Sequence, residues 1–172
     1  MKLIPLVLVA ALCLTAASVR AQTVTDAQIA SIVVTANQVD IDAGKLAESK
    51  ASKAEVKKFA QQMVTDHTGV NKQATELVTK LNVTPQDNPT SQSLKAGGEK
   101  NVTHLKMLSG AAFDKAYIDQ EVTYHEMVLT AVDKTLIPSA QNADLKALLV
   151  KVRPAFVAHL EHAKQVQETL GK

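Results

Sequence analysis

Residues 52–81 have the sequence SKAEVKKFAQQMVTDHTGVNKQATELVTKL, in which apolar side chains recur at alternating steps of four and three residues. Such steps place side chains along one face of an α-helix, whereas a half-buried strand would alternate at every second residue. Ser52 and Glu55 have the spacing of a capping box, which favours a helix start at this point. We therefore predict a helix over residues 53–81, with His67 in the middle of an apolar face made of Val56, Ala60, Met63, Val70, Ala74, Leu77 and Leu81.

Three further segments show the same spacing and predict amphipathic helices at residues 26–50, 112–137 and 143–170. Thr25 and Gln28 form a second capping box before the first of these helices. Asn142 is a suitable N-cap for the last helix, and Pro138 should end the helix before it. Pro154 lies inside the last helix and should kink it or remove one backbone hydrogen bond, at a cost of about 3 kcal/mol.

The connection between the second and third long helices is longer than the other two. Residues 82–90 contain two prolines and predict a loop. Residues 94–108 contain Gly97 and Gly98 and predict a short helix that carries the chain across the bundle; whether residues 91–110 hold one helix or two stays open. Together these elements predict an all-α fold. We expect an antiparallel four-helix bundle with an extra short helix in this connection, and one domain over residues 22–172.

The first 21 residues predict a signal peptide that is removed on export. Lys2 is followed by an apolar run at residues 3–17 and by small residues before the expected cleavage after Ala21. This run is shorter than the twenty or so apolar residues of a membrane-spanning helix, and no later segment approaches that length. We therefore expect a mature chain that begins at Gln22, has no transmembrane span and is periplasmic or secreted. Peripheral attachment to the outer membrane stays open.

Charge and cysteine content exclude several classes of function. The sequence has 19 Lys and Arg residues and 17 Asp and Glu residues, and the predicted signal contains Lys2, Arg20 and no acid. The expected mature chain therefore has no net charge, and it has no Trp, so we expect no nucleic-acid partner. The single cysteine, Cys13, lies in the predicted signal, which excludes disulfide and thiol chemistry after cleavage. The oligomeric state stays open.

Each predicted apolar face has one ionisable residue near its middle, and these residues are Asp40, His67, His125 and His159. At about 1.5 Å per residue, Asp40 and His67 differ in height by about 6 Å, as do His125 and His159. Helix ends are uncertain by about two to four residues, so a shared layer is allowed. An unpaired buried charge or imidazole costs several kcal/mol, so a bundle tolerates such residues where they satisfy one another or hold an ion.

Two interpretations of this layer stay open. The first is a metal site in the bundle core, since imidazole and carboxylate groups are ligands for zinc, iron, manganese and copper. The second is a hydrogen-bonded polar layer that sets the helix register. Di-iron carboxylate bundles use a Glu-x-x-His spacing that is absent from this sequence, so we expect any metal site to be mononuclear. Helical spacing adds further candidate ligands, namely Asp66, Glu121 and His162.

The remaining residues of the sequence do not indicate a second functional site. His104 has no convergent partner by spacing, so we predict that it lies at the surface. The sequence has no serine nucleophile motif, no phosphate-binding glycine loop and no cysteine-based metal signature. We therefore predict no catalytic residue and no site for an organic cofactor.

Several segments carry a resemblance to a known family; they are VDIDAGKLA at residues 39–47, VKKFAQQMVTDH at 56–67, FDKAYI at 113–118, and His159 with Leu160. Together they resemble the bacterial domain-of-unknown-function family 4142, whose members are often described as predicted outer membrane proteins. The resemblance implies a ferritin-like helical bundle behind a signal peptide in the bacterial envelope, and it implies no particular activity. It also implies that the characteristic positions are Asp66, His67, His125 and His159. At Asp40 and Asp42 the family often has Glu.

From the sequence we expect an exported, non-catalytic binding protein that acts in envelope maintenance or stress through contact with an envelope protein. The alternative is a metal-binding protein with a mononuclear site in the bundle core, formed by Asp40, His67, His125 and His159. An enzyme with a large substrate is disfavoured, because close-packed alanine-rich faces leave little pocket volume.

Overall fold

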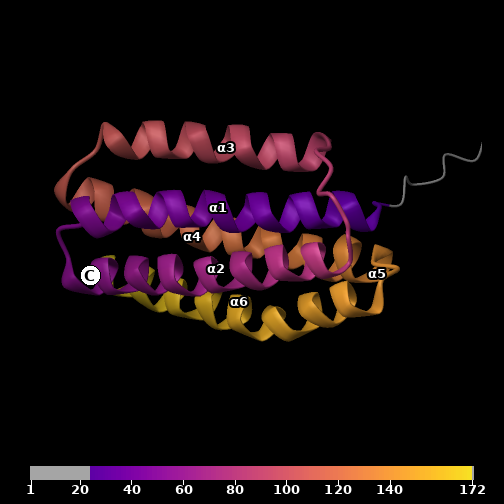
Figure 1. Cartoon of the computed structure of the whole chain (residues 1–172). Coiled ribbons are helices and arrows are strands. Elements are labelled where there is room, and N and C mark those ends of the chain that lie inside the picture. The colour runs from indigo at the N-terminus through magenta and orange to yellow at the C-terminus, as the bar shows by residue number, and fades with distance from the viewer. Residues whose placement is uncertain (1–23, 172) are drawn as a thin grey trace, which may run out of the picture.

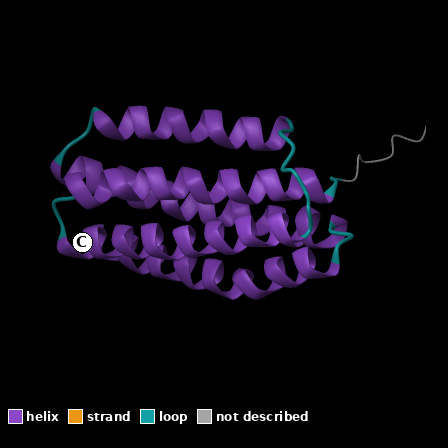
Figure 2. Cartoon of the chain, in the orientation of Figure 1, coloured by secondary structure: helices purple, strands orange, loops and turns teal. Residues whose placement is uncertain are grey.

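The computed structural model describes residues 24–171, and this part of the chain is helical without any strand (Figures 1 and 2). The all-α prediction is therefore confirmed. None of the described helices is long and apolar enough to cross a membrane. The predicted signal peptide lies outside the described residues. The elements are α1 (Asp26–Lys50), α2 (Ala54–Lys80), α3 (Pro89–Lys106), α4 (Gly110–Ala131), the π-helical segment η1 (Val132–Leu136), α5 (Ile137–Ser139) and α6 (Ala143–Leu170).

The starts of α1 and α6 agree with the sequence-based predictions. Thr25 and Gln28 form the predicted capping box, in which the Thr25 hydroxyl accepts from the Gln28 N–H and the Thr25 N–H donates to Gln28 Oε1. The Asn142 side chain accepts from the backbone N–H groups of Asp144 and Leu145. These caps satisfy backbone donors that have no partner within the helix.

The capping box predicted at Ser52 and Glu55 is wrong. The Ser52 and Lys53 N–H groups donate to the two carboxylate oxygens of Asp114, each at 2.9 Å, and the Ser52 hydroxyl also donates to Asp114. Asp114 lies on α4 and is completely buried. A carboxylate from a neighbouring helix therefore takes the place of the local cap, and it ties the start of α2 to α4.

α3 is a single continuous helix, which resolves the question that the sequence left open. It begins at Pro89, inside the predicted loop, because Asn88 caps it and proline is well tolerated in the first helical turn. It does not cross the bundle but runs along α1 (Figure 1). A Cβ atom at Gly98 would lie 2.7 Å from a methyl carbon of Val39 on α1, so the glycine permits this close approach.

Pro138 does not end the helix before it, contrary to the prediction. The predicted helix over residues 112–137 is α4 followed by η1, and the helical path continues through Pro138 to Ser139. α6 remains helical through Pro154. Arg153 makes two hydrogen bonds, of 2.6 and 2.7 Å, to Asp133 in η1, which link this segment to α6.

The four long helices α1, α2, α4 and α6 lie lengthwise beside one another and enclose the core (Figure 1). One apolar cluster includes Ala47 of α1, Val56 of α2 and Ala163 of α6. A second cluster includes Ile29, Ala74, Leu136 and Leu149 from the opposite ends of the same helices and from η1. On each long helix the predicted polar position falls between these two clusters. The fold therefore encloses one polar layer between two apolar layers.

Candidate metal centre

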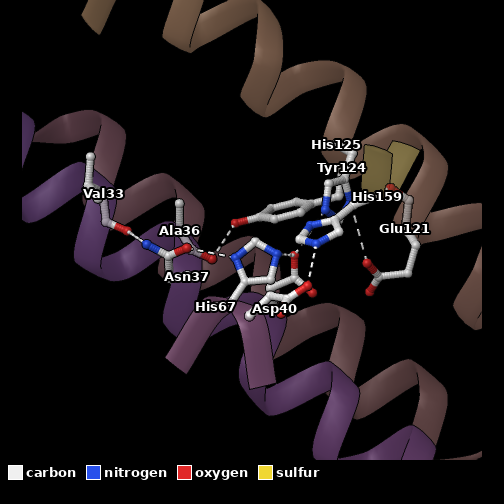
Figure 3. A network of polar contacts seen from close by, with 10 residues as sticks. Val33, Ala36, Asn37, Asp40, His67, Glu121, Tyr124, His125 and His159 are labelled. Carbon is white, nitrogen blue, oxygen red and sulfur yellow. Dashed lines mark hydrogen bonds and ion pairs between the residues drawn. The ribbon is translucent and has the colours of Figure 1, made fainter. Parts of the chain in front are cut away.

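The structure brings together the four residues that the sequence places mid-face on separate helices (Figure 3). Asp40 comes from α1, His67 from α2, His125 from α4 and His159 from α6, and each is at most 4% exposed. The ring centroids of the three histidines are 5.2 to 5.7 Å apart. The shared layer that the helix lengths allowed is therefore present.

Asp40 faces two of these histidines. Its Oδ2 atom lies 3.1 Å from His67 Nε2 and 3.6 Å from His125 Nε2. Ligand atoms around a tetrahedral zinc ion, with bonds of about 2.0–2.1 Å, lie about 3.3 Å from one another. These two separations are close to that value, so the carboxylate is placed to share an ion with both rings.

An asparagine that the sequence analysis missed fixes the orientation of His67. Asn37 lies one turn before Asp40 on α1, and its Nδ2 atom donates to the Val33 carbonyl at 2.8 Å. Its Oδ1 atom is therefore the acceptor for His67 Nδ1, at 2.6 Å. With the proton on Nδ1, a neutral His67 carries a free lone pair on Nε2, the nitrogen that faces Asp40.

The other two histidines are oriented in the same way. His125 Nδ1 lies 3.0 Å from the Glu121 carbonyl oxygen, and His159 Nε2 lies 2.9 Å from Asp66 Oδ2. A carbonyl oxygen and a carboxylate can only accept, so each of these nitrogens is the donor. The lone pairs of neutral His125 and His159 are therefore on Nε2 and Nδ1, respectively. Metal-binding histidines have this arrangement, with the second ring nitrogen donating to an acceptor outside the ligand shell.

The inner atoms of the layer have no hydrogen-bond partner among residues 24–171. They are both oxygens of Asp40, Nε2 of His67, Nε2 of His125 and Nδ1 of His159. Burial lowers the pKa of His125, although Asp40 offsets part of this effect. Burial, opposed by the hydrogen bond to Asp66, lowers the pKa of His159 to about 4. Both rings are therefore neutral at pH 7, and their inner nitrogens are electron-pair donors.

The two carboxyl groups of the layer behave differently. Burial would raise the pKa of Asp40, but the neighbouring imidazoles, with His67 contributing most, outweigh burial and hold this pKa below its ordinary value. Burial raises the pKa of Glu121 well above its ordinary value, and the nearby Asp40 carboxylate raises it further. Asp40 is therefore the anionic member, whereas Glu121 retains its proton to higher pH than an exposed glutamate would.

The further candidate ligands, Asp66, Glu121 and His162, differ in where they lie relative to the polar layer. Glu121 lies at the edge of the layer, with Oε2 3.5 Å from His125 Nδ1, and Asp66 contacts only the outer nitrogen of His159. The structure does not bring His162 into the layer, because its Nδ1 atom pairs with Gln62 Oε1 at 3.0 Å. His104 is exposed, as predicted.

The family described as Domain of unknown function (DUF4142) matches residues 11–166. The chain belongs to this family. The match covers every helix that contributes to the layer except the last residues of α6. Neither a curated protein nor a solved structure matches the chain. The family carries no assigned activity, so the function has to be inferred from the layer itself.

Proposed function

We propose that this protein binds one divalent transition-metal ion in the middle of the bundle, through His67 Nε2, His125 Nε2, His159 Nδ1 and the Asp40 carboxylate. Three imidazoles and one carboxylate form a ligand set suited to zinc, iron, manganese or copper. The carboxylate offsets one of the two positive charges of the ion. The alternative from sequence analysis, a core metal site, thereby becomes the leading hypothesis.

The convergence of unpartnered acceptors supports a metal over a simple polar layer. A hydrogen-bonded layer needs donors facing acceptors, and here each outer donor is already used by Asn37, Glu121 or Asp66. A proton on His67 would satisfy Asp40, but it would leave the inner nitrogens of His125 and His159 without a partner. Leaving each such buried group unsatisfied costs about 1 to 3 kcal/mol. One cation would satisfy all of them.

The proposed role is metal binding rather than catalysis. Four protein ligands close a tetrahedral shell, whereas catalytic zinc sites keep one position for water or substrate. His67 and His125 line an apolar cavity of about 100 Å³, which is too small for a large substrate, and of the four ligands Asp40 also lines a larger open groove between α3 and α4. Storage, sensing or buffering of an ion is consistent with this arrangement.

Nuclear magnetic resonance of the histidine rings tests the proposal. Zinc added to chelator-treated protein should saturate at one ion per chain. It should shift the Nε2 signals of His67 and His125 but the Nδ1 signal of His159, because those are the nitrogens without an outer partner. His104 and His162 serve as internal controls and should keep their signals. A titration that leaves all five rings unchanged would remove the basis for the metal site.

We also propose that the protein is exported to the periplasm or secreted, as its first 21 residues suggest, and that its helices form a ferritin-like bundle. The mid-bundle site contributed by four different helices supports that architecture. The expected mature N-terminus is Gln22, and N-terminal sequencing of exported protein checks it. Recovery of an intact Met1 in a membrane fraction would contradict export in this form.

A further inference from the structure

An open groove of about 530 Å³ lies between α3 and α4 and has part of α1 as its floor. Its walls carry uncharged side chains such as Ser93 and Asn101 on α3 and Gln120 on α4. Within the described chain, the acidic residues that line it are Asp40 and Glu121, and no Lys, Arg or His lines it. The groove therefore connects solvent with two carboxyl groups of the polar layer.

The packing of α3 explains why the groove exists. Gly98 brings α3 into close contact with Val39 of α1, while α3 makes few contacts with α4. A Cβ atom at Gly97 would have no neighbour within 4 Å, because this glycine faces open space in the groove wall. α3 thus covers α1 but leaves a passage along its α4 side.

Asp40 stands between this groove and the histidines. It lines the groove on one side, and on the other it lines the small apolar cavity together with His67 and His125. Glu121 is 2% exposed, and its Oε2 atom has no hydrogen-bond partner among residues 24–171. Asp40, Glu121 and His125 each offer a ligand atom, and these atoms lie within 4.8 Å of one another. This outer set therefore shares Asp40 and His125 with the proposed core set.

We propose that the groove is the route by which a divalent cation reaches the core, and that Asp40 and Glu121 form an outer site where the ion binds first. This inference rests on the proposed metal-binding function. The anionic Asp40 attracts a cation, Glu121 adds a buried oxygen without a hydrogen-bond partner, and the neutral walls hold no group that would compete with them. The ion then exchanges Glu121 for His67 and His159 while Asp40 and His125 keep hold of it. Glu121 is thus a transit ligand and is absent from the final ligand set.

Stopped-flow measurements with Co²⁺ as the probe test the role of Glu121, because cobalt bound to imidazole nitrogens absorbs visible light. Glu121→Gln should slow both association and release about tenfold or more, leaving the equilibrium Kd within about threefold of wild type. Glu126→Gln is the matched control, since Glu126 lies on the exposed side of α4 and pairs with Lys164. This control should load at the wild-type rate.

A second pair of variants tests the route independently. Gly97→Phe should place a ring in the groove and slow Co²⁺ association about tenfold or more. Gly69→Phe is its control, because Gly69 also lies in a helix and a Cβ atom there also meets nothing within 4 Å. Gly69 lies outside the groove lining, so this variant should load normally. Circular dichroism confirms that each variant is folded before its kinetics are compared.

The outcomes separate this inference from the proposed function. Normal loading of folded Gly97→Phe would overturn the groove as the route. A weaker Kd for Glu121→Gln at an unchanged association rate would show that Glu121 is a resident ligand, which also overturns the inference but leaves the metal site intact. Absence of a cobalt spectrum in wild type would overturn both the metal site and the route.

Discussion

His67→Ala should abolish most of the stabilisation that metal gives to the wild-type protein. The substitution removes one of four proposed ligands, and even loss of an outer-shell partner typically costs ten- to a hundredfold in metal affinity. We expect at least about a hundredfold weaker binding. At a metal concentration of about 100 times the wild-type Kd, wild type gains about 2.7 kcal/mol, whereas such a variant gains about 0.4 kcal/mol. For a domain of this size, the wild-type gain corresponds to an increase in Tm of roughly 5–10 °C.

Thermal melts with chelator and then with zinc, copper, iron or manganese measure this difference. Comparing each variant with and without metal separates the ligand effect from the cavity that the alanine leaves in the core. His104→Ala is the control, because His104 is exposed and lies outside the layer. It should gain as much stability from metal as wild type does. A wild type that none of these metals stabilises, or a His67→Ala variant that metal stabilises equally, would contradict the ligand assignment.

Without metal, the protein should lose stability as the pH falls from about 6.5 to 4. The pKa of His159 is about 4 in the folded protein, because burial opposes its charge, against an ordinary value of 6.5. The unfolded chain therefore binds more protons in this window, so the free energy of unfolding decreases as the pH is lowered. His159 alone should account for a loss of about 3 kcal/mol across the window. The lowered pKa of His125 acts in the same direction.

Glu121 opposes this trend, because its raised pKa lets the folded state bind a proton that the unfolded state has released. The contribution of His159 is therefore isolated by comparison with His159→Gln, which cannot titrate. Urea unfolding at several pH values in the presence of chelator should give a flatter pH dependence for this variant. His104→Gln should retain the wild-type dependence. Equal slopes for wild type and His159→Gln would show that His159 is not buried as a neutral ring.

The sequence alone determined the four long helices and the four mid-face polar residues that enter the core. The predicted helix at residues 26–50 has the bounds of α1, and α2 and α6 agree with their predictions within one residue at each end. Helical periodicity and local caps carry this information, because they depend on residues a few positions apart. The same local pattern located Asp40, His67, His125 and His159, since each interrupts an apolar face of its own helix.

Such local patterns could not predict contacts between segments that are far apart in the sequence. The cap of α2 comes from Asp114, 62 residues from Ser52, so local spacing gave the wrong cap. α3 packs closely along α1 because Gly98 leaves room for Val39, a contact that periodicity within α3 cannot predict. His162 follows His159 by three residues and is rotated by about 60° around the helix, enough to pair with Gln62 instead of joining the layer.

Tertiary structure alone also decided how close the side chains of the polar layer lie and which of their atoms remain without a partner. The heights deduced from helix lengths differed by about 6 Å, whereas Asp40 and His67 meet at 3.1 Å, because small errors in helix ends add up. Which nitrogen of each histidine remains free depends on Asn37, the Glu121 carbonyl and Asp66. Two of these three acceptors lie on a different helix from the ring they orient. A sequence specifies which groups are buried, but only packing between helices determines which of their atoms are left without a partner.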